Sequence, residues 1–79
     1  MTKLKEGTGI ELSDGKTYLC ILSLEIDGHD YSILSPRGEE KYILGEVVEE
    51  NGKRQFNIVE DEKIIQKVQD HYNGLPNLN

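Results

Sequence analysis

The chain has 79 residues, with nine Lys and Arg against fifteen Asp and Glu, which gives a formal net charge of −6 at pH 7. A chain of this length forms one domain and buries only about 60% of the surface that its unfolded form exposes, so a deep catalytic cleft is not expected. The negative charge has the wrong sign for neutralising phosphates or an anionic membrane surface, which argues against direct nucleic-acid binding and against membrane association.

Cysteine content and hydropathy indicate which compartment and which type of protein to expect. Cys20 is the only cysteine, which excludes an intrachain disulfide and a zinc site built on paired cysteines, and which favours a reducing compartment. The longest apolar run, Tyr18 to Leu22, is far shorter than the roughly 20 residues of a transmembrane helix. Residues 1–9 lack the apolar stretch of a signal peptide. We therefore expect a soluble cytoplasmic protein.

Three turn signals divide the first part of the chain into a predicted series of antiparallel hairpins. They are Ser13-Asp14-Gly15, Asp27-Gly28 and Asn51-Gly52, and each lies between runs rich in β-branched and aromatic residues. For the first turn, a three-residue loop with Gly15 in the left-handed conformation sets Ile10 opposite Tyr18. A two-residue loop would instead set Ile10 opposite Leu19, and we prefer the first because it keeps one face continuous.

Residues 17–26 are predicted to form a central strand, because apolar side chains alternate along one face. That face comprises Tyr18, Cys20, Leu22, Leu24 and Ile26. Leu19 and Ile21 make the opposite face partly apolar as well. A two-residue loop at Asp27-Gly28 pairs this strand with the run that follows it. The expected pairs are Ile26 with His29, Leu24 with Tyr31, Leu22 with Ile33 and Cys20 with Ser35.

A second hairpin is predicted after the segment from Pro36 to Glu40, which interrupts the meander because Pro removes a ladder donor. Its first strand runs from about residue 41 to residue 49, and Asn51-Gly52 forms the turn. The expected pairs are Glu50 with Lys53, Glu49 with Arg54, Val47 with Phe56 and Gly45 with Ile58. A bulge at Gly45 would change the face on which the preceding residues lie, so the register before Gly45 is left open.

From Glu60 onward, the apolar residues recur at the spacing of an α-helix. The predicted apolar stripe comprises Ile64, Ile65, Val68 and Tyr72. Asp61 is the expected N-cap, and His71 suits the negative end of the helix dipole.

Together the predicted strands and helix indicate an α+β fold, an antiparallel meander of about five strands with one C-terminal helix packed on one face. We expect a single domain with an ordered core over about residues 9–72 and a flexible tail over residues 73–79.

In this order the elements are similar to those of a known family. The matching stretches are Gly9 to Lys16, Tyr18 to Leu22, Asp30 to Pro36, Tyr42 to Val48 and Phe56 to Glu62. Together they resemble the YrzB-like domain of unknown function, which occurs in small acidic proteins of Gram-positive bacteria. The resemblance covers roughly residues 9–72. It implies a small cytoplasmic bacterial protein with no established activity, sometimes carried on mobile elements.

Residues with catalytic or metal-binding chemistry are few. Cys20 is expected to pack in the core, because a reactive cysteine needs a neighbouring cation or helix N-terminus. Asp27, His29 and Asp30 could offer ligands to a divalent ion, but Asp27 is needed for the turn and adjacent strand residues point to opposite faces. His71 has no nucleophile at a suitable spacing. We therefore predict no catalytic residue, no metal site and no cofactor, and conclude that the protein is not an enzyme.

Two functional hypotheses remain. The first is a protein-interaction or accessory module whose partner, a protein of unknown identity or a second copy in a homodimer, docks on a sheet edge or on the face marked by Leu19 and Ile21. One helix cannot cover both faces of a five-stranded sheet, so this apolar pair is expected to stay exposed.

The alternative hypothesis is an acidic nucleic-acid mimic or inhibitor, from a phage or mobile element, that presents Glu49 and Glu50 to a basic protein. Its further charges lie in two other clusters, Glu39-Glu40 and Glu60-Asp61-Glu62.

Overall fold

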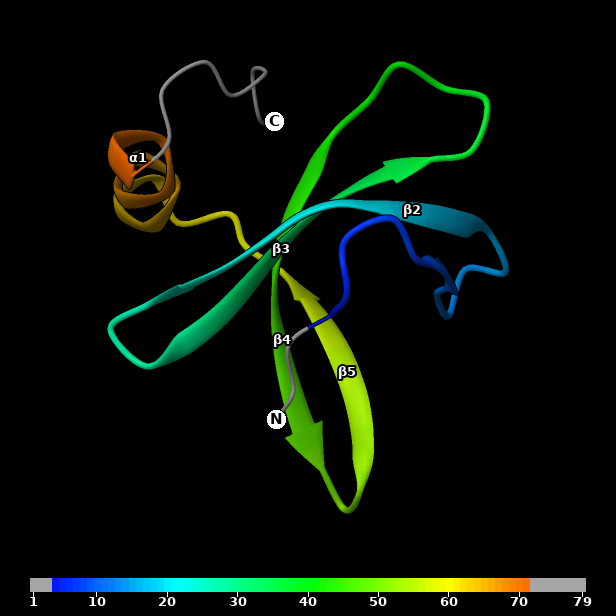
Figure 1. The fold of residues 1–79 in the computed structure, drawn as a ribbon, viewed down its shortest axis with the longest axis horizontal. Helices are drawn as coiled ribbons and strands as arrows, with labels where there is room; N and C mark the ends of the chain where they lie inside the picture. Colours follow the sequence, from blue (N-terminus) through cyan, green and yellow to red (C-terminus); the bar gives the residue numbers. More distant parts are fainter. Residues whose placement is uncertain (1–3, 72–79) are drawn as a thin grey trace.

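The computed structural model describes residues 4–71, which form five strands and one helix (Figure 1). The strands are β1 (Gly9–Glu11), β2 (Thr17–Ile26), β3 (His29–Pro36), β4 (Ile43–Glu50) and β5 (Lys53–Ile58), and the helix is α1 (Glu62–His71). All four strand pairs are antiparallel, and the sheet order β1-β2-β3-β4-β5 follows the chain. The predicted α+β meander with a C-terminal helix is confirmed. Tyr72 and the predicted tail over residues 73–79 lie outside the described residues.

The hairpin turns have the conformations that their sequences predict. Asp27 and Gly28 both have positive φ, at 53° and 79°, and so do Asn51 and Gly52, at 54° and 77°. Two consecutive residues of positive φ make the tight turn whose twist matches that of the flanking strands. Gly15, at a φ of 82°, closes the predicted three-residue loop, in which Leu12 N–H donates to the Lys16 carbonyl at 3.1 Å. Ile10 therefore pairs with Tyr18, as expected.

Most of the predicted register is confirmed. Around the second turn the observed pairs are Ile26 with His29, Leu24 with Tyr31 and Leu22 with Ile33. Around the last turn they are Glu50 with Lys53, Glu49 with Arg54, Val47 with Phe56 and Gly45 with Ile58.

The register of β2 changes at a β-bulge between Cys20 and Leu22. The predicted pair of Cys20 with Ser35 is wrong, because Cys20 lies opposite Leu34 and Leu19 lies opposite Ser35. One extra residue in a strand reverses the faces of everything beyond it. The predicted apolar face of β2 is therefore divided, so that its two halves lie on opposite faces of the sheet.

The two halves of β2 belong to two separate hydrophobic clusters. The helix-side cluster comprises Leu24, Ile26, Tyr31, Ile33, Leu44, Val59 and Val68. The inner cluster comprises Leu4, Tyr18, Cys20, Leu34 and Val47, with Ile10, Leu12, Ile43 and Phe56 partly buried against it. Because Ile10 of β1 and Phe56 of β5 both pack on the inner cluster, the sheet is curled, with its first and last strands on the same side.

Gly45 lies on the inner face directly under the ring of Phe56. A Cβ atom at position 45 would be 2.2 Å from Cζ of that ring, which is far inside van der Waals contact. The pairing on both sides of Gly45 is regular, with Ser32 on one side and Ile58 on the other. The strand thus carries no bulge here, and the glycine leaves room for an aromatic ring.

We predict that Gly45→Ala destabilises the protein by about 1–3 kcal/mol, the usual cost of overpacking a core. The measurement is urea unfolding followed by circular dichroism. In a Phe56→Leu background, where the side chain is smaller, the same substitution should have a clearly smaller effect. Equal effects in the two backgrounds would show that the ring over Gly45 is not the cause.

The helix begins where a side chain caps it. Asp61 Oδ1 accepts a hydrogen bond of 2.9 Å from Lys63 N–H, and the Asp61 carbonyl accepts from Ile64 and Ile65 at 3.1 and 3.0 Å. The predicted N-cap is confirmed. At the other end, His71 Nδ1 lies 3.0 Å from the Lys67 carbonyl, so an N–H there satisfies one of the last free carbonyls.

Val68 is the helical residue that joins the core. Its side chain is fully buried in the helix-side cluster, while Ile64 and Ile65 are partly buried against it. Burial of a large apolar side chain stabilises the fold by about 1.5–3 kcal/mol.

We predict that Val68→Asp lowers the free energy of unfolding by about 3 kcal/mol or more, because the carboxylate would be buried without a partner. Lys63→Asp places the same side chain at an exposed position of the first turn, where the helix dipole favours it. Thermal melts of both variants compare them. Equal melting temperatures would contradict the burial of Val68 in the helix-side cluster.

Candidate functional site

Three large apolar side chains are exposed in the described part of the chain. They are Leu19 and Ile21 on β2, with 44% and 41% of their surface exposed, and Ile58 at the end of β5, with 58%. Leu19 and Ile21 are the two residues that the sequence marked as a candidate interaction surface. Ile58 was not predicted as exposed, because its apolar character is equally typical of a core residue.

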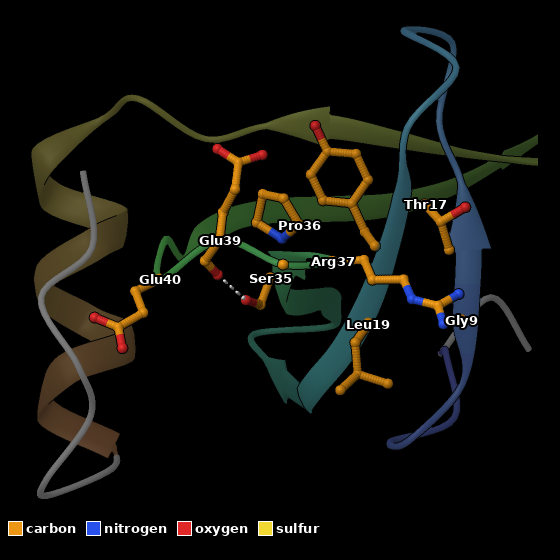
Figure 2. A pocket seen from close by; sticks show the side chains of 10 residues that line it. Gly9, Thr17, Leu19, Ser35, Pro36, Arg37, Glu39 and Glu40 are labelled. Carbon is orange, nitrogen blue, oxygen red and sulfur yellow. Dashed lines mark hydrogen bonds between the residues drawn. The ribbon is translucent and has the colours of Figure 1, made fainter.

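Leu19 lies in a groove at one end of the sheet (Figure 2). The groove has a volume of about 490 Å³ and is lined by Gly9, Thr17, Tyr18, Leu19, Ser35, Pro36, Arg37, Gly38, Glu39 and Glu40. Leu19 pairs with Gly9 on one side and with Ser35 on the other. Since paired residues share a face of the sheet and both neighbours are small, Leu19 stands over a hollow without tall side chains beside it. We call this the Leu19 groove.

The rim of the Leu19 groove is a turn that carries both signs of charge. Gly38 has a φ of 83°, and the turn is closed by Glu39 N–H, which donates to the Pro36 carbonyl at 3.2 Å. Arg37 N–H donates to the Thr17 carbonyl at 3.0 Å, which fixes the turn to β2. Glu39 also lies 3.8 Å from Lys16 Nζ. The groove therefore has an apolar centre and a rim of charged side chains held on a defined backbone.

The bulge separates Leu19 from Ile21. Leu19 lies opposite Ser35 and Leu22 opposite Ile33. Ser35 and Ile33 are two residues apart, so they and their partners share one face, which is the face of the helix-side cluster. Ile21 is the extra residue of the bulge and does not line the Leu19 groove. The two predicted interaction residues are thus both exposed but do not form one patch within that groove.

Glu49 and Glu50 lie at the tip of the β4-β5 hairpin, where both are exposed. Their cross-strand partners are Arg54 and Lys53, so the charges at this tip balance. The other acidic clusters lie elsewhere in Figure 1, one in the loop after β3 and one at the start of α1. The three clusters do not form a single acidic stripe along one element.

A second groove follows the seam between the two edge strands of the curled sheet. Residues 11–14 and Tyr18 form one wall, and Ile43 with residues 54–58 of β5 forms the other, around about 520 Å³. A smaller hollow of about 190 Å³ extends it past Leu4, Ile10 and Phe56. We call these two hollows together the seam groove. Ile58 lines it.

Tyr18 lines both grooves, and its side chain is hydrogen-bonded to Asp14 in the wall of the seam groove. The Tyr18 hydroxyl donates to Asp14 Oδ2 at 2.6 Å, and Lys16 N–H donates to Asp14 Oδ1 at 2.9 Å. The bond from Tyr18, followed by that from Lys16, lowers the pKa of Asp14 below its ordinary value of 3.8. The same bond raises the pKa of Tyr18, because it favours the protonated hydroxyl.

We predict that Tyr18→Phe raises the pKa of Asp14 toward 3.8, the value of an unperturbed side chain. A ¹³C NMR titration of the side-chain carboxyl measures it. Because folding lowers this pKa, Asp14 contributes stability above its unfolded pKa, and the contribution is lost as the pH falls through the folded pKa. The variant should lose that part of the acid dependence of stability. Tyr31→Phe removes a hydroxyl from the helix-side cluster and should leave the Asp14 titration unchanged; the same shift in both variants would contradict the assignment.

Cys20 is buried, with 1% of its surface exposed, inside a small polar network. Its Sγ lies 3.4 Å from Ser23 Oγ, which lies 3.3 Å from Ser32 Oγ. The Ser23 hydroxyl also donates to the Leu4 carbonyl, and Ser23 N–H donates to Glu6 at 3.0 Å. The network therefore fastens the segment before β1 to β2.

The side chains considered for metal binding are directed to different partners. Asp27 Oδ2 lies 3.3 Å from Lys67 Nζ, and His29 Nδ1 lies 2.7 Å from Glu46 Oε2. His29 and Asp30 are adjacent on β3 and so face opposite sides. Within residues 4–71, no three His, Cys, Asp or Glu side chains gather as a group that could hold a metal ion.

Comparison of the chain with family models, with curated proteins and with solved structures finds no match. Of the described residues, no helix has the length and apolar character to cross a membrane.

Proposed function

We propose that the protein is a non-catalytic protein-interaction module whose partner binds at the Leu19 groove. The observation that carries the proposal is the exposure of Leu19, 44% of its surface, at the centre of a groove of about 490 Å³. Its strand neighbours Tyr18 and Cys20 are both buried. An apolar side chain surrounded by a polar rim is the arrangement found at the core of protein interfaces.

The chemistry of the groove favours a protein partner. Its apolar centre suits one aliphatic or aromatic side chain of a partner, an anchor of the kind that dominates binding energy at interfaces. On the rim, Arg37 can pair with a carboxylate of that partner, and Glu39 can pair with an amine. A phosphate-rich ligand is disfavoured by Glu39 and Glu40 on the rim and by the net charge of −6.

We also propose that α1 covers part of the helix-side face, while the end of this face near Leu19 stays accessible to a partner. Support comes from Val68, which packs with Leu24 and Ile33, whereas no residue of α1 lines the Leu19 groove. The proposal also includes the resemblance to the YrzB-like domain, which implies a small cytoplasmic bacterial protein with no established activity.

The acidic-mimic alternative depends on Glu49 and Glu50 as stand-ins for phosphates. Both lie opposite a basic residue of the same hairpin, which weakens the negative field that a basic partner would meet. The interaction module is therefore the proposal that the side-chain placement supports better.

We predict that Leu19→Glu abolishes binding of a partner captured from a lysate of the source organism, because a carboxylate replaces the apolar contact. Leu19 is exposed, so the substitution should change the melting temperature little. Ile21→Glu is the matched control, since it makes the same exchange on the same strand at a similarly exposed residue outside the groove. Captured proteins are compared by mass spectrometry at low and at physiological salt.

Two outcomes would overturn this proposal. One is a partner that is retained by Leu19→Glu. The other is a partner that elutes with salt and is lost when Glu49 and Glu50 become Lys, which would favour the acidic mimic instead, because surface charge pairs are screened by salt.

A further inference from the structure

The outer edge of β5 presents a row of backbone groups to the seam groove. Val59 N–H donates to the Leu44 carbonyl at 2.9 Å, and this bond fixes the alternation along the β4-β5 pair. In an antiparallel pair, successive residues alternately bond to the neighbouring strand and point away from it. Arg54, Phe56 and Ile58 therefore direct their N–H and C=O groups away from β4. Among the described residues, no strand pairs with this edge.

Beyond Lys53 and Arg54 at its start, β5 lacks the devices that usually block strand addition. Natural edge strands are very short, bulged, or carry proline or charged residues. β1, the other edge of the sheet, is only three residues long, whereas β5 has six residues in regular register with β4. Its stretch Gln55–Ile58 contains neither a charge nor a proline. The edge also ends in Ile58, the most exposed of the three exposed large apolar side chains.

We propose that β5 pairs in antiparallel fashion with β5 of a second copy of the chain, about a two-fold axis at Phe56, and so forms a symmetric dimer. An extended strand is the protein partner that matches the alternating donors and acceptors of this edge. A pairing centred on Phe56 joins the outward-facing residues of both subunits, since residues 54, 56 and 58 are spaced evenly about it. It continues the two curled sheets into one.

The side chains of β5 complement themselves in this register. Arg54 lies opposite Ile58 of the partner subunit, so its methylene groups cover the exposed isoleucine while its charge stays in solvent. Like charges never face each other. On the other face of the strand, Gln55 lies opposite Asn57 of the partner subunit, and both are amides that can bond to each other.

Charge does not oppose a second copy at this edge. Two chains with a net charge of −6 repel each other wherever their acidic surfaces meet. At the β4-β5 hairpin, however, Glu49 and Glu50 lie beside Arg54 and Lys53, so this part of each subunit is neutral. The Leu19 groove is lined by residues of β1, β2, β3 and the loop after β3, and dimerisation through β5 does not depend on it.

The test measures mass and amide exchange on the intact protein. Sedimentation equilibrium at millimolar concentration should give twice the monomer mass of 9.0 kDa. Hydrogen exchange followed by NMR should show slower exchange of the Arg54, Phe56 and Ile58 amides in the dimer than at dilution. The Gln55 and Asn57 amides, which already bond to β4, should change little. A monomer at millimolar concentration, or a dimer in which those three amides exchange as fast as in the monomer, overturns the proposal.

Single substitutions test whether dimerisation depends on the β5 edge or on the Leu19 groove. Ile58→Pro removes an outward N–H and leaves the bonds to β4 in place, so it should give a folded monomer. Ile58→Val keeps the N–H and the branched side chain and should stay dimeric. Leu19→Glu should also stay dimeric, since it alters only the other groove. A dimer that persists in a folded Ile58→Pro variant contradicts the proposal. If that variant does not fold, amide exchange of the wild-type protein still tests whether the outer edge of β5 is paired in the dimer. Exchange protection of this edge by a foreign peptide, with a wild type that stays monomeric, would assign the edge to a different partner and refute the dimer.

Discussion

The bulge at Ile21 is the constraint on which the rest of the structure depends. By inserting one residue between Cys20 and Leu22, it turns Tyr18 and Cys20 to the inner cluster and Leu24 to the helix-side cluster. A regular strand would place all of these side chains on one face. A bulge also increases local twist, and the sheet curls until β1 and β5 pack on the same inner cluster. One residue thus enables a chain of 79 residues to bury both faces of its sheet.

Burying both faces matters because small domains have little interior. A flat five-stranded sheet under one ten-residue helix would leave its second face in water, which is the arrangement that the sequence alone suggests. Curling covers that face with the protein's own edge strands and with Leu4, of which 6% is exposed. The price is a polar network inside the curl, where Ser23 and Ser32 satisfy each other and the carbonyl of Leu4. Since no buried side-chain polar atom in the described residues lacks a partner, the network does not weaken the core.

Turn chemistry explains why so much of the fold could be predicted. Asp27-Gly28 and Asn51-Gly52 determine both register and loop length locally, because the left-handed conformations they adopt are accessible to few residue pairs. The helix is likewise encoded by its cap at Asp61 and its apolar period. The bulge could not be predicted, because Ile21 is β-branched and carries no local sign of irregularity. The division of the core into two clusters depends on the bulge and was not predicted either. The exposure of Leu19 was expected, but for a different reason, because the bulge places Leu19 on the face of the helix-side cluster and not on the opposite face.

Both candidate surfaces follow from how far the curl extends. On the helix-side face, Leu19 has only Gly9 and Ser35 as paired neighbours, so the face ends in a hollow beyond the reach of Val68. At the seam, β1 does not pair with β5, and no other strand of the described chain pairs with the outer edge of β5. The first surface offers a side-chain pocket, and the second offers backbone hydrogen bonds. These are different modes of recognition, because a pocket selects a particular side chain whereas a strand edge selects an extended conformation. The two proposed modes of binding do not exclude each other, since no residue lining the Leu19 groove belongs to β5.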